Sequence, residues 1–456
     1  MRRLDSLFAH AALLPQGWTE RVRLQFDAAG DIVALETAAT PQDGERQAGL
    51  VLPGMTNLHS HAFQRALAGM TEVAATAGDS FWTWRDLMYR YALQLTPQQM
   101  QAIAAQIYSE CLRHGYTSVC EFHYLHRAPD GAWYPDQAET ARRVIAAAAT
   151  AGIGMTMLPV LYSHADFADV PLRADQRRFA TEVSDVLALV AALEPLRSAA
   201  LEIGAAPHSL RAANLAQITE LHAGMPAGRP IHIHIAEQTR EVDACLRTTG
   251  KRPVELLLAT GLVDQHWCLV HATHLNADEV TALAASAAVA GICPSTEGNL
   301  GDGFFDLPAY LAVGGRFGIG SDSHVSHSPV EELRWLEYGQ RLRLQQRNIA
   351  RDEKQRRVGD YLWNAALQGG AQASGRRVGQ LQVGWRADLL VLDECHPNLA
   401  GLALDDVLNT WLFCGNDNLL RDVIVGGQLV VENGRHHQQA AIAADYIACL
   451  QNLRAL

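Results

Sequence analysis

The chain has 456 residues, of which 48% are hydrophobic and 19% charged, so a sizeable core is available and bulk disorder is not expected. Its formal net charge of -12 at pH 7 argues against a general nucleic-acid binder, which needs a basic surface. This length fits one large catalytic domain accompanied by a minor one.

Cysteine usage and the N-terminal run bear on the compartment. The eight cysteines are scattered and form no Cys-x-x-Cys pair, which is typical of reduced, mostly buried thiols and predicts a cytoplasmic protein. Asp5, His10 and Pro15 interrupt the N-terminal apolar run, so we expect no signal peptide. No apolar stretch reaches roughly eighteen residues, and we expect no membrane partner.

The two ends of the chain predict strands. Residues 21–36 alternate apolar and polar positions around an Ala-Gly-Asp turn, which is typical of a hairpin. Residues 378–393 and 423–436 have the same texture, with short apolar runs between Gly turns. These segments predict one small β-sandwich assembled from residues 1–50 and 376–440, followed by a C-terminal helix over 441–456.

The segment from 51 to 375 alternates strand-like and helical stretches. One helix is expected to begin after Thr96, with Pro97 in its first turn, and to end at Gly115. Eight such repeats predict an α/β fold, a (β/α)8 TIM-type barrel. A doubly wound sheet is the alternative, although no Gly-rich phosphate loop opens a helix. The strand-like runs are 49–61, 116–122, 153–162, 200–206, 230–237, 267–274, 288–295 and 316–324.

Polar residues follow several of these runs, at the barrel end where TIM-barrel enzymes carry their catalytic groups. The first run ends in His59-Ser60-His61, and because a strand has a period of two, both imidazoles face one way and can chelate one metal. The fifth run places His232 and His234 on one face. Glu237 follows at the end of this fifth run. The sixth run carries His271 near its end, and the eighth run carries Asp322.

Each of these signals has a structural alternative when it is taken alone. A buried histidine is often a satisfied core residue, and a Ser-Asp pair after an apolar run is often a helix N-cap. Four or five ligand-type residues at the same end of successive strands are hard to explain by packing. Together they predict a metal-dependent hydrolase with its centre at the barrel mouth.

With this constellation, the sequence resembles the amidohydrolase superfamily over nearly its whole length. Five strings, at 59–69, 120–126, 206–211, 232–238 and 293–303, are similar to those of the formimidoylglutamate deiminase family within it. Some superfamily members bind two metals through a carboxylated Lys on the fourth strand. The only lysines here, Lys251 and Lys354, lie far from that strand, so one metal is implied.

The resemblance implies a reaction and a set of roles. The implied reaction is metal-dependent hydrolysis of N-formimino-L-glutamate to N-formyl-L-glutamate and ammonia in histidine degradation, by a cytoplasmic homodimer. The implied ligands of a single Zn²⁺, with iron or manganese as alternatives, are His59, His61, His234 and Asp322. The implied catalytic residues are Glu237, His271 and Asp322, and the implied substrate-binding residues are Gln64, Arg85, Tyr124, His208 and Arg211.

Several of these residues also have plainer interpretations. Arg85 could pair with Asp86 or stack on Trp82 or Trp84, and Arg211 could cap a helix or lie on the surface. Tyr124 could be a core residue with a satisfied hydroxyl. His232 is interpreted as facing the lumen one layer below the metal, and the remaining histidines near strand ends as supporting or loop residues: His123, His126, His274, His324 and His327.

Two competing functions remain open from the sequence. A related mononuclear deaminase could act on formiminoaspartate, a purine or a triazine, although a neutral heterocycle does not require two arginines. A scaffold protein without activity is the other class. The complete ligand set and Glu237 argue against it.

Overall fold

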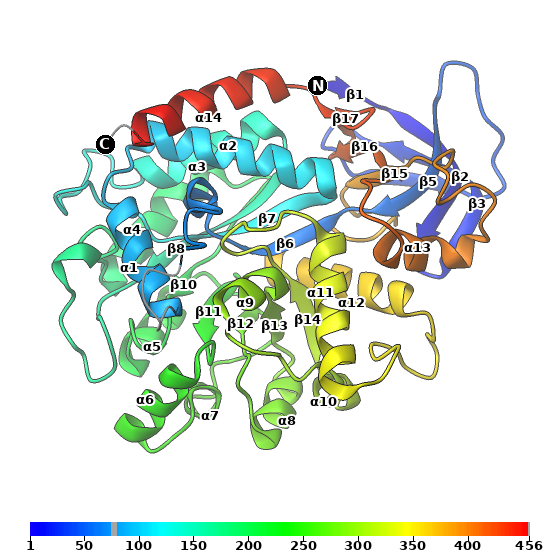
Figure 1. Ribbon diagram of the computed structural model, residues 1–456. Coiled ribbons are helices and arrows are strands. Elements are labelled where there is room, and N and C mark those ends of the chain that lie inside the picture. Colours follow the sequence, from blue (N-terminus) through cyan, green and yellow to red (C-terminus); the bar gives the residue numbers. More distant parts are fainter. Residues whose placement is uncertain (74–79, 455–456) are drawn as a thin grey trace.

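The computed structural model describes residues 1–73 and 80–454, and its centre is a parallel barrel (Figure 1). Two sheets, ordered β10-β8-β7-β6 and β11-β12-β13-β14, are joined at both seams by bridges between Ser60 and Asp322 and between Ala205 and Ile231. The predicted (β/α)8 barrel is confirmed, and the doubly wound alternative is wrong. Its strands are β6 (Met55–Ser60), β7 (Tyr116–His123), β8 (Gly154–Leu161), β9 (Leu201–Ile203), β10 (Ala206–Pro207), β11 (Ile231–Ile235), β12 (Trp267–His271), β13 (Val289–Ile292) and β14 (Arg316–Ile319).

Helices follow the barrel strands and surround them. The helix predicted after Thr96 is α2 (Pro97–His114); the Thr96 hydroxyl accepts from the Gln99 backbone N–H, and Gly115 ends the helix at φ 112°. The others around the barrel are α3 (Glu139–Ala151), α4 (Val183–Leu193), α5 (Leu215–Gly224), α6 (Thr239–Thr249), α7 (Pro253–Leu258), α8 (Ala277–Ala285), α9 (Pro294–Leu300), α10 (Leu307–Ala312), α11 (Pro329–Leu344) and α12 (Val358–Ser374).

The remaining helices lie over the barrel mouth, beside the terminal sheet and at the C-terminus. They are α1 (Phe81–Ala92), α13 (Val407–Phe413), α14 (Gln439–Arg454) and the 3₁₀ turns η1 (Ala62–Leu67), η2 (Ala174–Gln176), η3 (Glu194–Leu196) and η4 (Leu404–Asp406). The last helix, α14, runs alongside α2 (Figure 1), with Cys449 and Leu453 buried between them. None of the described helices combines the length and apolar character needed to cross a membrane.

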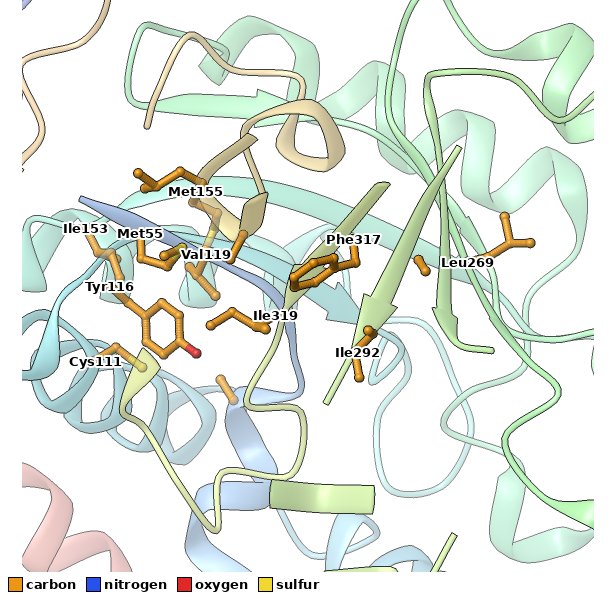
Figure 2. Close-up of a cluster of buried hydrophobic side chains, with 14 of the residues drawn as sticks. Met55, Cys111, Tyr116, Val119, Ile153, Met155, Leu269, Ile292, Phe317 and Ile319 are labelled. Carbon is orange, nitrogen blue, oxygen red and sulfur yellow. The ribbon is translucent and has the colours of Figure 1, made fainter. Parts of the chain in front are cut away.

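Apolar side chains of the strands and helices form the barrel core. Figure 2 shows part of it, with Met55, Tyr116 and Val119 from one side of the barrel and Ile292 and Phe317 from the other. Burial of such side chains stabilises the fold by about 1.5–3 kcal/mol each. This core holds the strands rigidly, so the residues that follow them are held in fixed positions.

The chain ends form a nine-stranded sheet in which N-terminal and C-terminal strands are neighbours. Its order is β1-β17-β16-β15-β5-β2-β3-β4, with β18 on β17, and its apolar face encloses a core of its own. The β-sandwich predicted from the two chain ends corresponds to this single sheet. Its strands are β1 (Arg2–Arg3), β2 (Ser6–Leu14), β3 (Gly17–Phe26), β4 (Ile32–Glu36), β5 (Arg46–Pro53), β15 (Leu389–Leu392), β16 (Leu420–Val425), β17 (Gln428–Glu432) and β18 (Arg435–His436).

The first predicted strand, 49–61, is divided between the two units. Pro53 pairs with Leu389 in the terminal sheet, whereas Met55 begins the barrel strand β6. Gly54 lies between them, where any side chain would collide with Thr117. The close approach of the two units therefore requires glycine at this point.

All eight cysteines are free thiols. Cys395 and Cys414 are exposed and the other six are buried, in agreement with the interpretation of the sequence.

Candidate active site

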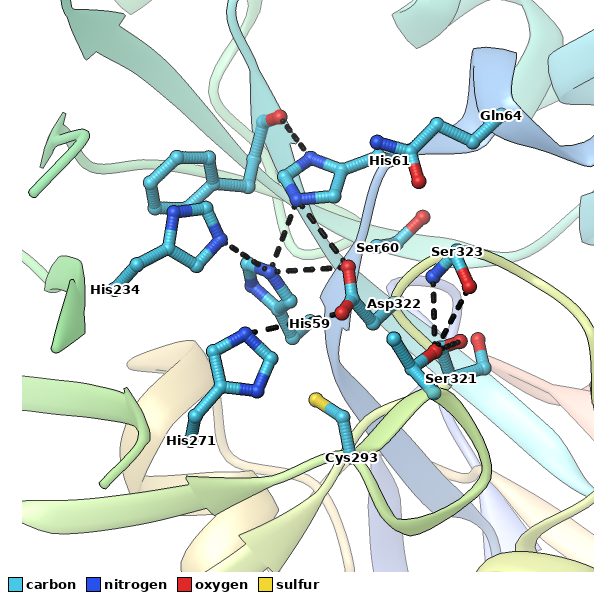
Figure 3. A network of polar contacts seen from close by, with 12 residues as sticks. His59, Ser60, His61, Gln64, His234, His271, Cys293, Ser321, Asp322 and Ser323 are labelled. Atoms are coloured by element: carbon cyan, nitrogen blue, oxygen red, sulfur yellow. Dashed lines mark hydrogen bonds and ion pairs between the residues drawn. The ribbon is translucent and has the colours of Figure 1, made fainter. Parts of the chain in front are cut away.

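Four predicted metal ligands meet at the carboxyl end of the barrel (Figure 3). The Nε2 atom of His59 lies 3.1 Å from that of His61 and 2.9 Å from that of His234. Oδ1 of Asp322 lies 3.3 Å from Nε2 of His61 and 3.6 Å from Nε2 of His59. All four residues are buried. Side chains from β6, β11 and the end of β14 thus converge on one point.

The donor set fits a single divalent cation. Burial lowers the pKa of His61 to about 3 and that of His234 well below its usual value, so these imidazoles are neutral at pH 7 and offer lone pairs. The Nδ1 atom of His61 donates to the Phe122 carbonyl, which leaves Nε2 free to bind. His59, His61 and His234 form one group that could hold a metal ion, and His59, His271 and Asp322 form a second that shares His59.

The backbone is strained at two of the residues near this point. His271 and Asp322 have φ values of 68° and 49°, in the left-handed region that costs a non-glycine residue on the order of 1 kcal/mol. Such strain persists where the surrounding structure fixes the backbone. Here both side chains lie close to His59.

His271 is surrounded by carboxylates. Its Nε2 atom lies 3.6 Å from Glu237 and 3.8 Å from Asp322, and its Nδ1 atom lies 3.3 Å from Glu297. Burial alone would lower the pKa of His271, but Glu237, Glu297 and Asp322 outweigh it and raise that pKa to about 10. The three carboxylates thus favour the protonated form of the His271 imidazole.

A second acid, Asp302, lies behind Glu237 and was not predicted. Its carboxylate is within 4.8 Å of the nearest Glu237 and His271 atoms and accepts from the Gln238 amide. Burial and the neighbouring Glu237 raise the pKa of Asp302 to about 9. Its sequence context, between Gly301 and Gly303, lies within one of the strings that carried the family resemblance.

A buried polar network fixes the strands that bear the ligands. The Glu121 carboxylate accepts from the Ser60 hydroxyl at 2.6 Å, the Tyr108 hydroxyl at 2.9 Å and the Ala62 backbone N–H at 2.8 Å. His324 connects Ser60 to Ser321, the neighbours of His61 and Asp322. Glu121 was not predicted to contribute, although a single acid inside an apolar strand is a recognisable signal.

One pocket contains the predicted substrate residues beside the metal ligands. It is lined by Gln64, Arg85, Tyr124, His208 and Arg211, together with Glu237 and His271. The Gln64 amide donates to the Tyr124 hydroxyl at 2.9 Å, and aromatic side chains of α1 form one wall. The structure therefore brings every predicted substrate residue to the same cavity.

Neither arginine in this pocket forms an ion pair among the described residues, although, against the effect of burial, Glu241 and Glu237 raise the pKa of Arg211. Nε of Arg85 and Nε of Arg211 are buried without a hydrogen-bond partner, and neither side chain forms an ion pair there. The alternative pairing of Arg85 with Asp86 is wrong, because Asp86 pairs with Arg173 at 3.0 Å. Stacking is observed instead, with Arg85 Cζ 4.5 Å from the Trp82 ring centroid. A buried cation without an ion pair is costly, so the buried Arg211, with the half-buried Arg85 in the same pocket, is suited to an anionic ligand.

The other histidines make structural contacts. Nε2 of His232 donates to the Ala373 carbonyl at 2.8 Å, and Nε2 of His274 donates to the Asp302 carbonyl at 2.9 Å. Nε2 of His123 lies 3.0 Å from the Thr140 hydroxyl, and His126 accepts from the Val160 backbone N–H. The ring of His327 contacts that of His114 at 4.4 Å.

Comparison with known proteins agrees with this geometry. The model of the amidohydrolase family matches residues 50–430, and that of formimidoylglutamate deiminase HutF, N-terminal domain, matches residues 5–49. Formimidoylglutamate deiminase of Pseudomonas aeruginosa is 52% identical over 99% of this chain and 100% of its own. An amidohydrolase crystal structure from Brucella melitensis has a TM-score of 0.94 and 41% identity over 99% of this chain and 100% of its own.

A more distant structure shares the fold alone. It is an adenosine deaminase from Xanthomonas campestris with bound zinc, which has a TM-score of 0.80 at 20% identity over 99% of each chain. The family matches and the full-length relative are decisive. The chain belongs to the amidohydrolase family and, within it, to the formimidoylglutamate deiminases.

Proposed function

We propose that this protein hydrolyses the formimino group of N-formimino-L-glutamate to give N-formyl-L-glutamate and ammonia, as a step of histidine degradation. The observation that carries this proposal is a pocket in which the buried Arg211 and the half-buried Arg85 form no ion pair among the described residues, beside acidic and histidine side chains that could hold a metal ion. The substrate has two carboxylates at one end and a hydrolysable amidine at the other. The name of the 52% identical relative supports the same reaction.

The metal in this proposal is Zn²⁺, held by His59, His61, His234 and Asp322, because imidazole and carboxylate donors suit a borderline divalent cation. Iron and manganese accept the same donors. When bound, the cation supplies a water molecule with a lowered pKa and positive charge for the developing oxyanion.

The proton transfers are assigned to the chain's own residues. Glu237 takes a proton from the attacking water while the water oxygen bonds to the amidine carbon. The same carboxyl then delivers this proton to the leaving nitrogen, and as the C–N bond breaks and ammonia departs it accepts the remaining hydroxyl proton, so that the formyl C=O forms. His271 donates a hydrogen bond to the reacting oxygen, and Asp322 shares the first transfer.

Substrate orientation is assigned to the far end of the pocket. Arg211 and Arg85 offer planar guanidinium forks that match carboxylate geometry, while the Gln64, Tyr124 and His208 side chains provide further polar contacts. In this arrangement the two carboxylates of the substrate lie at the arginines. The cationic amidine lies at the other end of the pocket, where the negative charge of Glu237 favours it. A neutral purine or triazine would leave both arginines unpaired, at a cost of several kcal/mol.

The test is ammonia release from formiminoglutamate, formiminoaspartate and adenosine, assayed side by side with the metal-loaded enzyme. The proposal expects kcat/KM for formiminoglutamate to exceed that for formiminoaspartate by at least tenfold, about 1.4 kcal/mol, and no turnover of adenosine. A preference for either competitor would replace the proposed substrate.

We propose further that the protein is a cytoplasmic homodimer. Its domain limits are those expected from the sequence, with residues 1–50 and 376–440 in the terminal unit and residues 51–375 in the barrel.

An apolar face on α11 supports the dimer: Trp335, Tyr338 and Leu342 are 51%, 38% and 78% exposed. Phe304 and Val325 adjoin it along the same groove. Light scattering of the wild type and of Leu342→Asp tests the dimer, since a charge there should yield monomers.

A further inference from the structure

Three guanidinium groups surround the indole ring of Trp82 on α1. Cζ of Arg240 lies 4.4 Å from the ring centroid, Cζ of Arg85 lies 4.5 Å from it, and Cζ of Arg211 lies 5.8 Å from it. Arg85 and Arg211 line the pocket, whereas Trp82 and the exposed Arg240 do not. The indole therefore lies between two pocket cations and a third cation from the first turn of α6.

None of the three arginines forms an ion pair among the described residues. Two nearby acids are engaged elsewhere: Arg173, whose Cζ lies 5.4 Å from the Tyr89 ring, pairs with Asp86 at 3.0 Å and with Asp175 at 2.8 Å. Glu241 acts on Arg211 through its charge but forms no ion pair with it. What the three guanidinium groups share is therefore contact with an aromatic ring, and none of them forms an ion pair with a carboxylate among the described residues.

This difference decides what the cluster can do. Three cations close together repel one another, and a carboxylate would relieve the repulsion but also cancel the positive field. The face of an indole attracts a cation within about 6 Å by roughly 0.5–2 kcal/mol and leaves its charge in place. Focused positive charge at a pocket mouth raises the association rate of anionic ligands.

We propose that Trp82 is a positioning residue that orients Arg85 and Arg211 for carboxylate binding, and that Arg240 is a specificity-determining cation that attracts dianionic substrates. The inference rests on the proposed function, because it takes the ligand to be a dicarboxylate. It assigns a role to Trp82, which contacts the pocket arginines, and to Arg240, which contacts Trp82, although neither residue lines the pocket.

The test of Arg240 compares Arg240→Gln with Arg247→Gln, which removes the same charge from an exposed position on the same helix. At low ionic strength, Arg240→Gln should lower kcat/KM for formiminoglutamate by about threefold to tenfold, mainly through KM. The loss should shrink toward wild type at about 0.5 M salt, where charges are screened. Equal kcat/KM and equal salt dependence in both variants would remove Arg240 from the proposal.

The test of Trp82 compares Trp82→Leu with the conservative variant Trp82→Phe. Trp82→Leu should raise KM by about tenfold. Trp82→Phe should have a KM closer to that of the wild type, because a phenyl ring retains the interaction with cations. Thermal midpoints of both variants show whether α1 still folds. Leucine and phenylalanine variants with the same KM would exclude the stacking role.

Binding of glutarate, measured by calorimetry without turnover, separates this inference from the proposed function. If the wild type releases no ammonia from formiminoglutamate but binds glutarate more tightly than Arg240→Gln at low salt, the proposed reaction fails and the inference stands. If formiminoglutamate is hydrolysed while glutarate affinity is the same in both Arg240→Gln and Arg247→Gln, the inference fails and the reaction stands.

Discussion

The Glu237 carboxylate lies 3.6 Å from Nε2 of His271, and the same nitrogen lies 3.8 Å from Asp322. One imidazole thus lies between Asp322, a predicted metal ligand, and Glu237, an acid outside the predicted ligand set. Because these groups come from the ends of three different strands, the barrel rather than any loop fixes their spacing. The division of labour between metal binding and proton transfer can be tested one residue at a time.

Glu237→Gln should retain the metal and lose most turnover. The amide preserves the shape of the side chain but cannot take a proton, and general-base losses are typically about 10²–10⁴-fold in kcat. Metal content by elemental analysis and ammonia release by the same enzyme preparation check both halves. Glu220→Gln, at an exposed position on α5, controls for charge removal. Turnover within a few-fold of wild type would remove Glu237 from the mechanism.

Arg211→Met should weaken substrate binding and so raise KM. Loss of a buried charge-assisted contact to a carboxylate costs about 1.5–3 kcal/mol, which corresponds to a KM raised by about tenfold to a hundredfold. Arg211→Lys keeps the charge but loses the planar fork, so its KM should lie between those of the wild type and Arg211→Met. Steady-state kinetics with formiminoglutamate measure the effect. An unchanged KM in the methionine variant would place the carboxylates elsewhere.

Removal of the metal should destabilise the fold. Nε2 of His59 lies 3.1 Å from Nε2 of His61 and 2.9 Å from Nε2 of His234, and a ligand that binds only the folded state stabilises it by mass action. Chelation should therefore lower the thermal midpoint by several degrees, and added Zn²⁺ should restore it. His234→Ala should start near the chelated midpoint and respond little to Zn²⁺. An unchanged midpoint after verified metal loss would contradict the site.

Glu332→Gln should flatten the pH dependence of stability. Burial raises the pKa of Glu332 to about 8, while its carboxylate accepts from the hydroxyl and backbone N–H of Ser295. Between the unfolded and folded pKa values the folded state binds more protons, so the free energy of unfolding falls as pH rises, by at most about 1.4 kcal/mol per pH unit.

The measurement is the thermal midpoint of wild type and Glu332→Gln between about pH 5 and pH 8, since glutamine resembles the protonated acid and does not ionise. The variant should lose less stability than wild type as pH rises. Glu20→Gln, at an exposed strand position, should follow the wild-type curve. Parallel curves for Glu332→Gln and wild type would show that this group ionises normally.

The sequence by itself determined the barrel and the identity of the metal-ligand candidates. Strand and helix periodicities are local properties, and the position of a residue at a strand end can be counted along the chain. His59, His61, His234 and Asp322 could therefore be placed at one rim before any coordinates were known. The break of the first strand run at Gly54 was missed, because it depends on a contact with Thr117.

Only the tertiary structure decided which side chains are partners. Asp86 is adjacent to Arg85 in the sequence yet pairs with Arg173, while Arg85 stacks on Trp82 near Arg240, which lies more than a hundred residues away. Likewise, Glu121 and Asp302 became parts of the site through burial beside other elements. Periodicity specifies which way a side chain faces, but the neighbour it meets depends on how separate elements pack.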